Sequence, residues 1–218
     1  LTEVQNEIPG EVRLLFQEGE EIFSGAKKIV ADGGMDGVDA VFGMHGMPID
    51  IGFYDIKPGY RMAGCDTIYV KFEGVSGHGS SPHLAKDTIL PAAEFVTQLN
   101  AMITKFVNSQ SPLVLTVGKF DAGTKANIIS KYAKLDISMR YLEEETRRTI
   151  HEKIRNLAAG LAIIYDVKID VDIEESAISM RNDERIAEIA NKSAERIFGP
   201  NKNVNGPILM GSEDMPYY

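Results

Sequence analysis

Between about residues 66 and 173, the order of the apolar patterns is compatible with few folds. Four segments are predicted strands: residues 66–74, 113–123, 131–141 and 167–173. The first, third and fourth alternate apolar and polar side chains, which is typical of half-buried strands. Two longer segments, 87–107 and 143–165, repeat apolar residues at helical spacing instead. The predicted order is therefore strand, helix, strand, strand, helix, strand.

This order is that of a ferredoxin-like layer, in which two helices cover four antiparallel strands. In the first strand Ile68, Val70 and Phe72 share one face, which we expect to be buried. His151 lies inside the charged second helix and is predicted to be a surface residue.

The flanking segments have a different pattern. Residues 11–17, 38–45 and 51–59 are predicted strands, and a short helix over 24–32 has Ser24 as its expected N-cap. Strand, helix, strand indicates a parallel βαβ unit. We therefore expect an α/β catalytic domain formed by residues 1–65 and 174–218, with a ferredoxin-like lid domain inserted at 66–173. The missing initiator Met and the unfinished ending "GSEDMPYY" predict a piece of a longer protein.

Composition removes several classes of function. The net charge is −9 without a basic tract, which argues against a nucleic-acid partner. No apolar run approaches the roughly 18 residues of a membrane span, so no membrane partner is expected. The only cysteine, Cys65, rules out an internal disulfide and favours a reducing, cytoplasmic location.

Two acidic residues, Glu20 and Glu21, follow the first predicted strand, and His45 ends the second. Ligands bind at the carboxyl ends of parallel strands, and carboxylates with an imidazole suit Zn²⁺ or a similar ion. Two adjacent acids cannot easily face one metal, so one would bind the metal and the other would accept a proton from water. The alternative is a solvated loop beside an ordinary strand-end histidine.

Three more polar residues are candidates. His78 lies in "GVSGHGSSPH" among glycines and serines, where its ring can reach out of a loop, although the segment also fits a mobile linker. The role of His83 in the same segment stays open. Arg140 ends a strand and could bind a carboxylate with its planar fork, or be solvated; Asn127 lies in "AGTKANII".

The motifs "FQEGEE", "GMH", "GHGSSPH", "GTKANII", "SMR" and "GSEDMPYY" stand in this order along the whole chain. In that order the chain resembles the M20 metallopeptidases, above all their amidohydrolase branch of aminoacylase-, hippurate- and auxin-conjugate-hydrolysing enzymes. The resemblance implies a role for each candidate: Glu20 as general base, Glu21 and His45 as metal ligands, His78 as the lid residue that supports the oxyanion, and Asn127 and Arg140 as holders of the substrate or its carboxylate.

Part of the family pattern is missing. The upstream "HxCGHD"-type segment and the C-terminal histidine ligand are not in this sequence, and Cys65 is not the family's bridging cysteine. The resemblance implies two divalent ions per full-length subunit (Zn, Mn, Co or Ni), whereas this chain supplies two ligands. We therefore expect it to be inactive alone. Glu213 and Asp214 match a "GED" motif, and their role stays open.

The resemblance implies metal-dependent hydrolysis of N-acyl amino acids or related small amides. It also implies a homodimer through the lid domain, in which His78 reaches the partner's site. A dipeptidase or carboxypeptidase on the same scaffold is one alternative. A non-catalytic relative that dimerises or binds a ligand is another.

Overall fold

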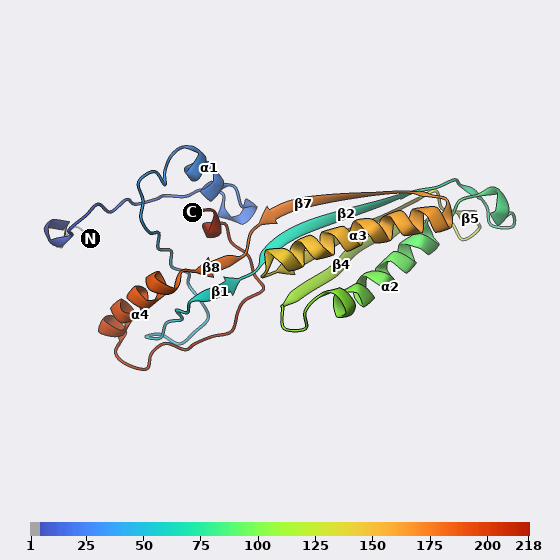
Figure 1. Cartoon of the computed structure of the whole chain (residues 1–218). Coiled ribbons are helices and arrows are strands. Elements are labelled where there is room, and N and C mark those ends of the chain that lie inside the picture. Colours follow the sequence, from blue (N-terminus) through green and yellow to red (C-terminus); the bar gives the residue numbers. More distant parts are fainter. Residues whose placement is uncertain (1–4) are drawn as a thin grey trace.

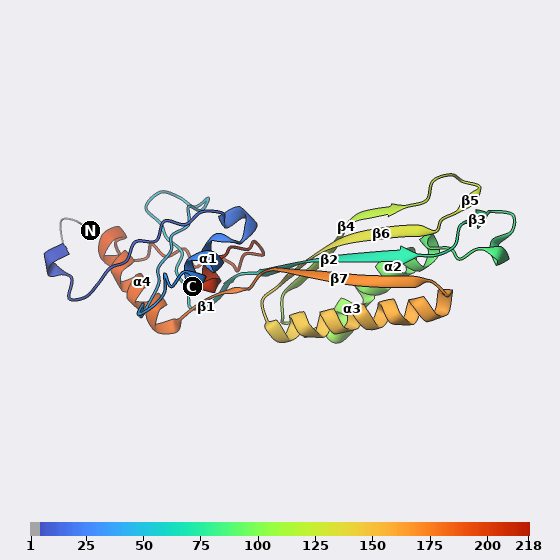
Figure 2. The same ribbon diagram turned by 90° about the horizontal axis from the view of Figure 1, so that it is seen from above.

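The structure, a computed structural model, describes residues 5–218 and contains a four-stranded antiparallel sheet. Its strands are β2 (Gly64–Glu73), β4 (Leu113–Ala122), β6 (Tyr132–Tyr141) and β7 (Lys168–Ala177). They lie in the order β4-β6-β2-β7. Helices α2 (Ile89–Phe106) and α3 (Glu144–Tyr165) cover one face, as Figures 1 and 2 show. The predicted ferredoxin-like layer is confirmed.

The alternation of β2 explains which face is covered. Ile68, Val70 and Phe72 are 0% exposed, as predicted. Phe72 meets Phe95 of α2 edge to face, with ring centroids 5.9 Å apart. Each such side chain removed from water contributes roughly 2 kcal/mol before entropy is counted, so this layer can hold its own core.

Polar groups extend this packing toward the end of the sheet near the chain termini. His151 is buried, and its Nε2 lies 2.8 Å from Oδ2 of Asp66, so the prediction of a surface histidine is wrong. Asp66 is 0% exposed at the start of β2 and needs hydrogen-bond donors there. The helical spacing of apolar residues identified the helix correctly. His151 was placed on its exposed face only because the side chain is polar, and that placement was wrong.

Beyond the opposite end of this sheet, two short strands form a separate small sheet. β3 (Gly77–His78) pairs with β5 (Ile128–Ile129), beside the 3₁₀ turn η3 (Pro82–Leu84). Figures 1 and 2 place this tip at the end of the molecule farthest from α1.

The remaining elements gather around the other end of β2 and β7. β1 (Gly59–Met62) pairs with β8 (Met180–Asn182). The helices are α1 (Gly25–Ala31) and α4 (Glu184–Phe198), and the 3₁₀ turns are η1 (Gln5–Glu7), η2 (Glu20–Ile22) and η4 (Met215–Tyr217). Ser24 precedes α1 as predicted, but its side chain makes no capping bond. Helix α4 was not predicted, although Ile186, Ile189 and Ile197 recur near helical spacing.

The three strands predicted in the first flank are wrong. Residues 11–17 and 38–45 form no strand, and 51–59 adds one isolated bridge, Tyr54 to Asn203, before β1 begins at Gly59. Phe16 is 91% exposed and Met44 fully exposed. An apolar run indicates a need for burial, but a strand also needs a neighbour for its N–H and C=O groups. Residues 5–218 supply none here, so the parallel βαβ unit is not formed.

The predicted boundaries at residues 65 and 173 stay predictions, and residues 1–4 of the first range lie outside the described part. Every helix within residues 5–218 is too short or too polar to cross a lipid bilayer.

Candidate functional site

The acid pair stands on a tight turn. Glu20 and Glu21 open the 3₁₀ turn η2, and both side chains are exposed. Gly19 and Phe23 flank the turn in the left-handed region, with φ of 67° and 52°. Within residues 5–218 neither carboxylate takes part in a hydrogen bond or ion pair, so both can receive a ligand or a proton.

His45 and Glu213 lie in the same neighbourhood as this turn. Burial, the largest influence, raises the pKa of Glu213; the His45 charge lowers it and the Glu20 charge raises it. The His45 ring is exposed, and its Nδ1 lies 3.3 Å from the carbonyl oxygen of Gly46. The fold thus gathers residues 20, 45 and 213 although the predicted strands are absent.

The metal chemistry of this neighbourhood is partial. Glu21 and His45 offer a carboxylate and an imidazole, donors that Zn²⁺, Mn²⁺ and similar ions accept. In the described part of the chain no group of three or more His, Cys, Asp or Glu residues is arranged to hold a metal. These two side chains therefore fit as part of a ligand set.

A second group of predicted site residues lies at the far tip. His78 is in β3, and the N–H of Gly79 donates to the carbonyl of Asn127 at 2.8 Å, so these two predicted residues are neighbours. Nδ1 of His78 accepts the backbone N–H of Ser80 at 3.2 Å and lies 2.7 Å from its Oγ. An acceptor at Nδ1 leaves the ring proton of a neutral histidine on Nε2, so Nε2 can donate.

Arg140 occupies the end of β6 nearest the acid pair. It pairs in register with Cys65 of β2, and its Nη1 donates to Oγ of Ser212 at 2.7 Å. Burial raises the pKa of the Cys65 thiol, and the Arg140 charge opposes this. Arg140 thereby joins the sheet to the segment that carries Glu213.

The two groups are far apart within one chain. β2 and β6, ten residues each, run from the acid-pair end to the tip. At about 3.3 Å per residue they span roughly 30 Å. One chain therefore places Glu20 and His45 at one end and His78 and Asn127 at the other.

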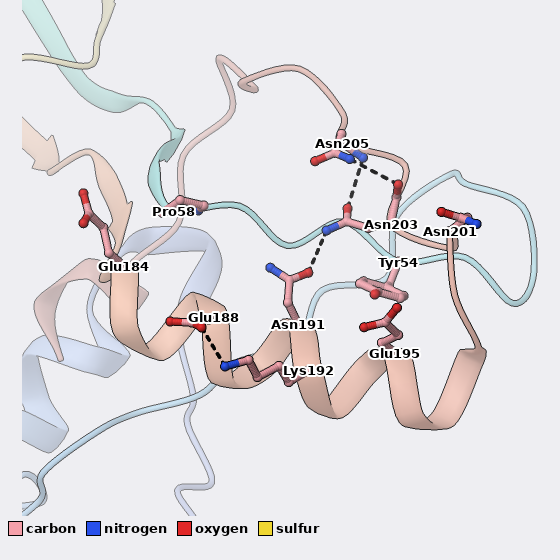
Figure 3. Close-up of a pocket in the computed structure, with 10 residues that line it drawn as sticks. All are labelled: Tyr54, Pro58, Glu184, Glu188, Asn191, Lys192, Glu195, Asn201, Asn203 and Asn205. Atoms are coloured by element: carbon pink, nitrogen blue, oxygen red, sulfur yellow. Dashed lines mark hydrogen bonds and ion pairs between the residues drawn. The ribbon is translucent and has the colours of Figure 1, made fainter.

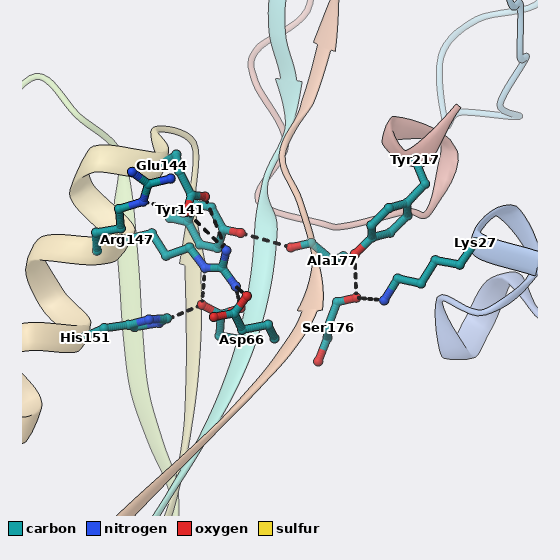
Figure 4. Close-up of polar contacts among 11 residues, drawn as sticks. Lys27, Asp66, Tyr141, Glu144, Arg147, His151, Ser176, Ala177 and Tyr217 are labelled. Carbon is teal, nitrogen blue, oxygen red and sulfur yellow. Dashed lines mark hydrogen bonds and ion pairs between the residues drawn. The ribbon is translucent and has the colours of Figure 1, made fainter. Parts of the chain in front are cut away.

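A buried ionic cluster, which sequence reasoning missed, joins α3 to the base of β2 (Figure 4). Arg147 donates to both carboxylate oxygens of Asp66, at 2.8 and 3.0 Å, and His151 contacts one of them. Burial alone would raise the pKa of Asp66, but hydrogen bonds and charges from His151 and Arg147 outweigh it, so the pKa is lowered. The cluster stabilises the junction and involves none of the predicted site residues.

An open pocket of about 450 Å³ lies against α4, away from the predicted site (Figure 3). It is lined mainly by amides and carboxylates. Nδ2 of Asn203 donates to Oδ1 of Asn191 at 2.7 Å and to the carbonyl of Ile56 at 2.8 Å. These bonds tie α4 to neighbouring loops, which gives the polar lining a structural purpose.

Three comparisons relate the chain to known proteins. Residues 62–166 match the family described as the peptidase dimerisation domain. The chain is 36% identical over 215 residues to hippurate hydrolase of Campylobacter jejuni, covering 96% of this chain and 56% of that protein. It is 30% identical to N-acetyl-L-cysteine deacetylase of Bacillus subtilis, covering 100% of this chain and 52% of that protein.

A solved structure agrees with these relatives. The Bacillus subtilis YXEP protein, described as a dinuclear metal binding peptidase of the M20 family, superposes with a TM-score of 0.74 at 27% identity. The match covers 91% of this chain and 50% of that one. The chain thus spans about half the length of the relatives it matches.

Proposed function

The chain is related to the M20 peptidases and amidohydrolases along nearly its whole length and contains their dimerisation domain; on this premise we propose that it is part of a metal-dependent amidohydrolase. The proposed reaction is hydrolysis of the amide bond of N-acyl amino acids or related small amides. The names of two relatives, hippurate hydrolase and N-acetyl-L-cysteine deacetylase, support this substrate class.

The observation that carries the proposal is the acid pair with its surroundings. Glu20 and Glu21 are presented to solvent on η2, with His45 and Glu213 nearby. Here two acids, an imidazole and a part-buried third acid lie together, as metal-assisted hydrolysis needs.

The adjacent acids have separate roles in the proposal. Glu21 and His45 would contribute two ligands to a divalent ion, which when bound would supply Lewis acidity for activating water and polarising the amide carbonyl. Glu20 accepts a proton from the attacking water and passes it to the leaving nitrogen. A second ion, further ligands, and the choice among Zn, Mn, Co and Ni belong to the full-length subunit.

His78 stabilises the oxyanion in this proposal, and it does so in the partner subunit. Its Nε2 is the free donor, because Ser80 occupies Nδ1. The roughly 30 Å length of the sheet keeps it from the Glu20 of its own chain. A two-fold homodimer through the dimerisation domain brings the tip of one chain to the base of the other.

Substrate contacts complete the site. Arg140 keeps further guanidinium N–H groups beyond the one that Ser212 accepts, and these can bind a substrate carboxylate. Asn127 lies beside His78 and contacts substrate from the same tip.

The proposed division has a catalytic domain in residues 1–65 and 174–218 and a lid in 66–173. β2 begins at Gly64 and β7 ends at Ala177, so the two strands of the lid extend a few residues beyond the proposed boundaries on each side. A cytoplasmic location, supported by the single cysteine, belongs to the same proposal.

Subunit mixing tests the reaction and the dimer together. His78→Ala and Glu20→Ala variants of the complete protein that carries this chain are each expected to be inactive. After verified exchange, half the dimers are mixed and each has one working site, so activity should return to about a quarter of wild type. Leu84→Ala, in the exposed turn η3 at the same tip, is the matched control and should stay active. If activity does not recover in verified mixed dimers, His78 does not act in the site of the partner subunit.

A substrate panel separates the alternatives. Faster hydrolysis of N-acyl amino acids than of dipeptides supports the amidohydrolase, and the reverse supports a dipeptidase or carboxypeptidase. Binding without turnover of either class, in protein with its full metal content, would indicate the non-catalytic relative.

A further inference from the structure

Asp214 is a buried carboxylate that holds the two ends of the acid-pair loop. It is 1% exposed, and both of its oxygens are bonded. Oδ1 accepts Nε2 of Gln17 at 2.7 Å, and Oδ2 accepts the backbone N–H of Ala26 at 3.0 Å. Glu20 and Glu21 lie between these two anchor points in the sequence, so one side chain closes the loop that presents them.

The neck of this loop is tight as well as hydrogen-bonded. A Cβ added to Gly25 would lie 1.7 Å from the carbonyl oxygen of Glu18, so only glycine fits where the two legs cross. Gly19 and Phe23 turn the chain through the left-handed region inside the loop. With the neck closed, little freedom remains for the turn between.

The segment that carries Asp214 is itself fixed to the sheet. The hydroxyl of Tyr218 donates to Oε1 of Gln17. The hydroxyl of Tyr217 donates to the carbonyl of Ser176 at the end of β7, at 3.1 Å, and Nζ of Lys27 reaches the same carbonyl at 3.3 Å (Figure 4). Through these contacts Asp214 holds the acid-pair loop in a fixed position relative to the end of β7, at the base of the lid.

We infer that Asp214 is a positioning residue that sets where Glu20 and Glu21 stand relative to His45. The effect of Asp214 on catalysis rests on the proposed function. Its two hydrogen bonds to Gln17 and Ala26, which we call the Asp214 clamp, do not. Asp214 acts through Gln17 and Ala26, whereas its neighbour Glu213 lies close enough to Glu20 and His45 to feel their charges. Adjacent acids of one motif thus have different tasks.

Hydrogen exchange and kinetics test the inference. Asp214→Asn can accept only one of the two N–H groups, so amides of residues 18–26 should exchange at least about tenfold faster while those of β2 and β6 do not change. In the complete protein kcat should fall by about 100-fold with little change in KM, since a displacement near 1 Å can cost that much. Affinity for Mn²⁺ alone should weaken as Glu21 loses its place.

A paired exchange of side chains makes the test specific. In the double variant Asp214→Asn with Gln17→Glu, the Asn amide N–H donates to the Glu carboxylate. The Asn carbonyl oxygen still accepts the backbone N–H of Ala26. Net charge is unchanged, and this variant should recover slow exchange and most of kcat. The control Asp183→Asn alters another carboxylate that accepts a backbone N–H, from Ile186, and should leave the loop and kcat unchanged.

The outcomes decide whether Asp214 positions Glu20 and Glu21 or only stabilises the folded chain. Unchanged exchange at residues 18–26 in Asp214→Asn, or unchanged kcat despite a loosened loop, overturns the inference, and so does a paired variant that recovers neither. If Asp214→Asn does not fold, Gln17→Ala removes one anchor at a half-buried position and takes the same readouts. Wild-type protein without hydrolase activity would reject the proposed function, while the exchange arm would still decide the clamp.

Discussion

The sheet region, residues 64–177, and the flanking segments differ in how they treat apolar side chains. In the sheet region the large apolar residues of β2 and β6 are buried under α2 and α3. In the flank, Phe16 and Phe42 are 91% and 61% exposed, although their local sequences are equally apolar. The sheet region therefore buries its own apolar faces, whereas residues 5–218 leave those of the flank uncovered.

This contrast agrees with the extent of the chain. It spans 56% and 52% of its first two relatives. In those longer relatives, we expect the segments that correspond to residues 11–17 and 38–45 to pair with strands from the part that this chain does not cover. The sheet region, by contrast, closes its own ladder and core.

The largest expected effect compares two phenylalanines. Phe72→Ala should lower the free energy of unfolding by about 4 kcal/mol, because it leaves a cavity in the core. Phe16→Ala should change it by less than about 0.5 kcal/mol. Urea unfolding of this chain, followed by circular dichroism, measures both. Equal losses would mean that something covers Phe16 in solution, and the contrast would fail.

A smaller effect tests the junction between the regions. Asp66→Asn should cost roughly 3 kcal/mol near pH 7, because it leaves Arg147 buried beside a weakened partner. The folded state lowers the pKa of Asp66, so its stabilisation is present above the unfolded value of about 4 and is lost as pH falls further. Unfolding measured between pH 3 and 7 should therefore vary less with pH in the variant.

The control for this prediction is Asp170→Asn, which alters an exposed ion pair with Lys168 on β7. Such pairs contribute about 0–1 kcal/mol. If this variant flattens the pH profile as much as Asp66→Asn does, the buried cluster is not its source.

The smallest expected effect concerns local order in the flank. Asp183 caps α4 by accepting the N–H of Ile186 at 3.0 Å. Asp183→Ala should destabilise the helix by about 1 kcal/mol, seen as faster amide exchange in α4 alone. Lys192→Ala, which breaks an exposed pair with Glu188, should cost about 0.4 kcal/mol. Faster exchange in β2 or β6 would contradict the independence of the two regions.

Much of the fold was predictable because its signals are local. The alternation in β2 and β6 and the spacing in α2 and α3 fixed which faces meet, and the structure buries those faces. The sequence identified some of the candidate site residues and missed others. Glu20, Glu21 and His45 stood out by type and place, whereas Gln17 gave no local signal and Asp214 only an unassigned motif.

The order of elements in the sheet region and its buried faces could be predicted from sequence, since the periodicity of apolar residues is encoded within a few residues. Three features appear only in the folded chain: His151 is buried on Asp66, the predicted strands of the flank find no neighbour within residues 5–218, and Asp214 closes the loop of Glu20. The carboxylate of Asp214 finds the N–H of Ala26 across 188 residues. A buried polar group must take its partner from whichever segment the fold brings near, and no local pattern specifies that segment.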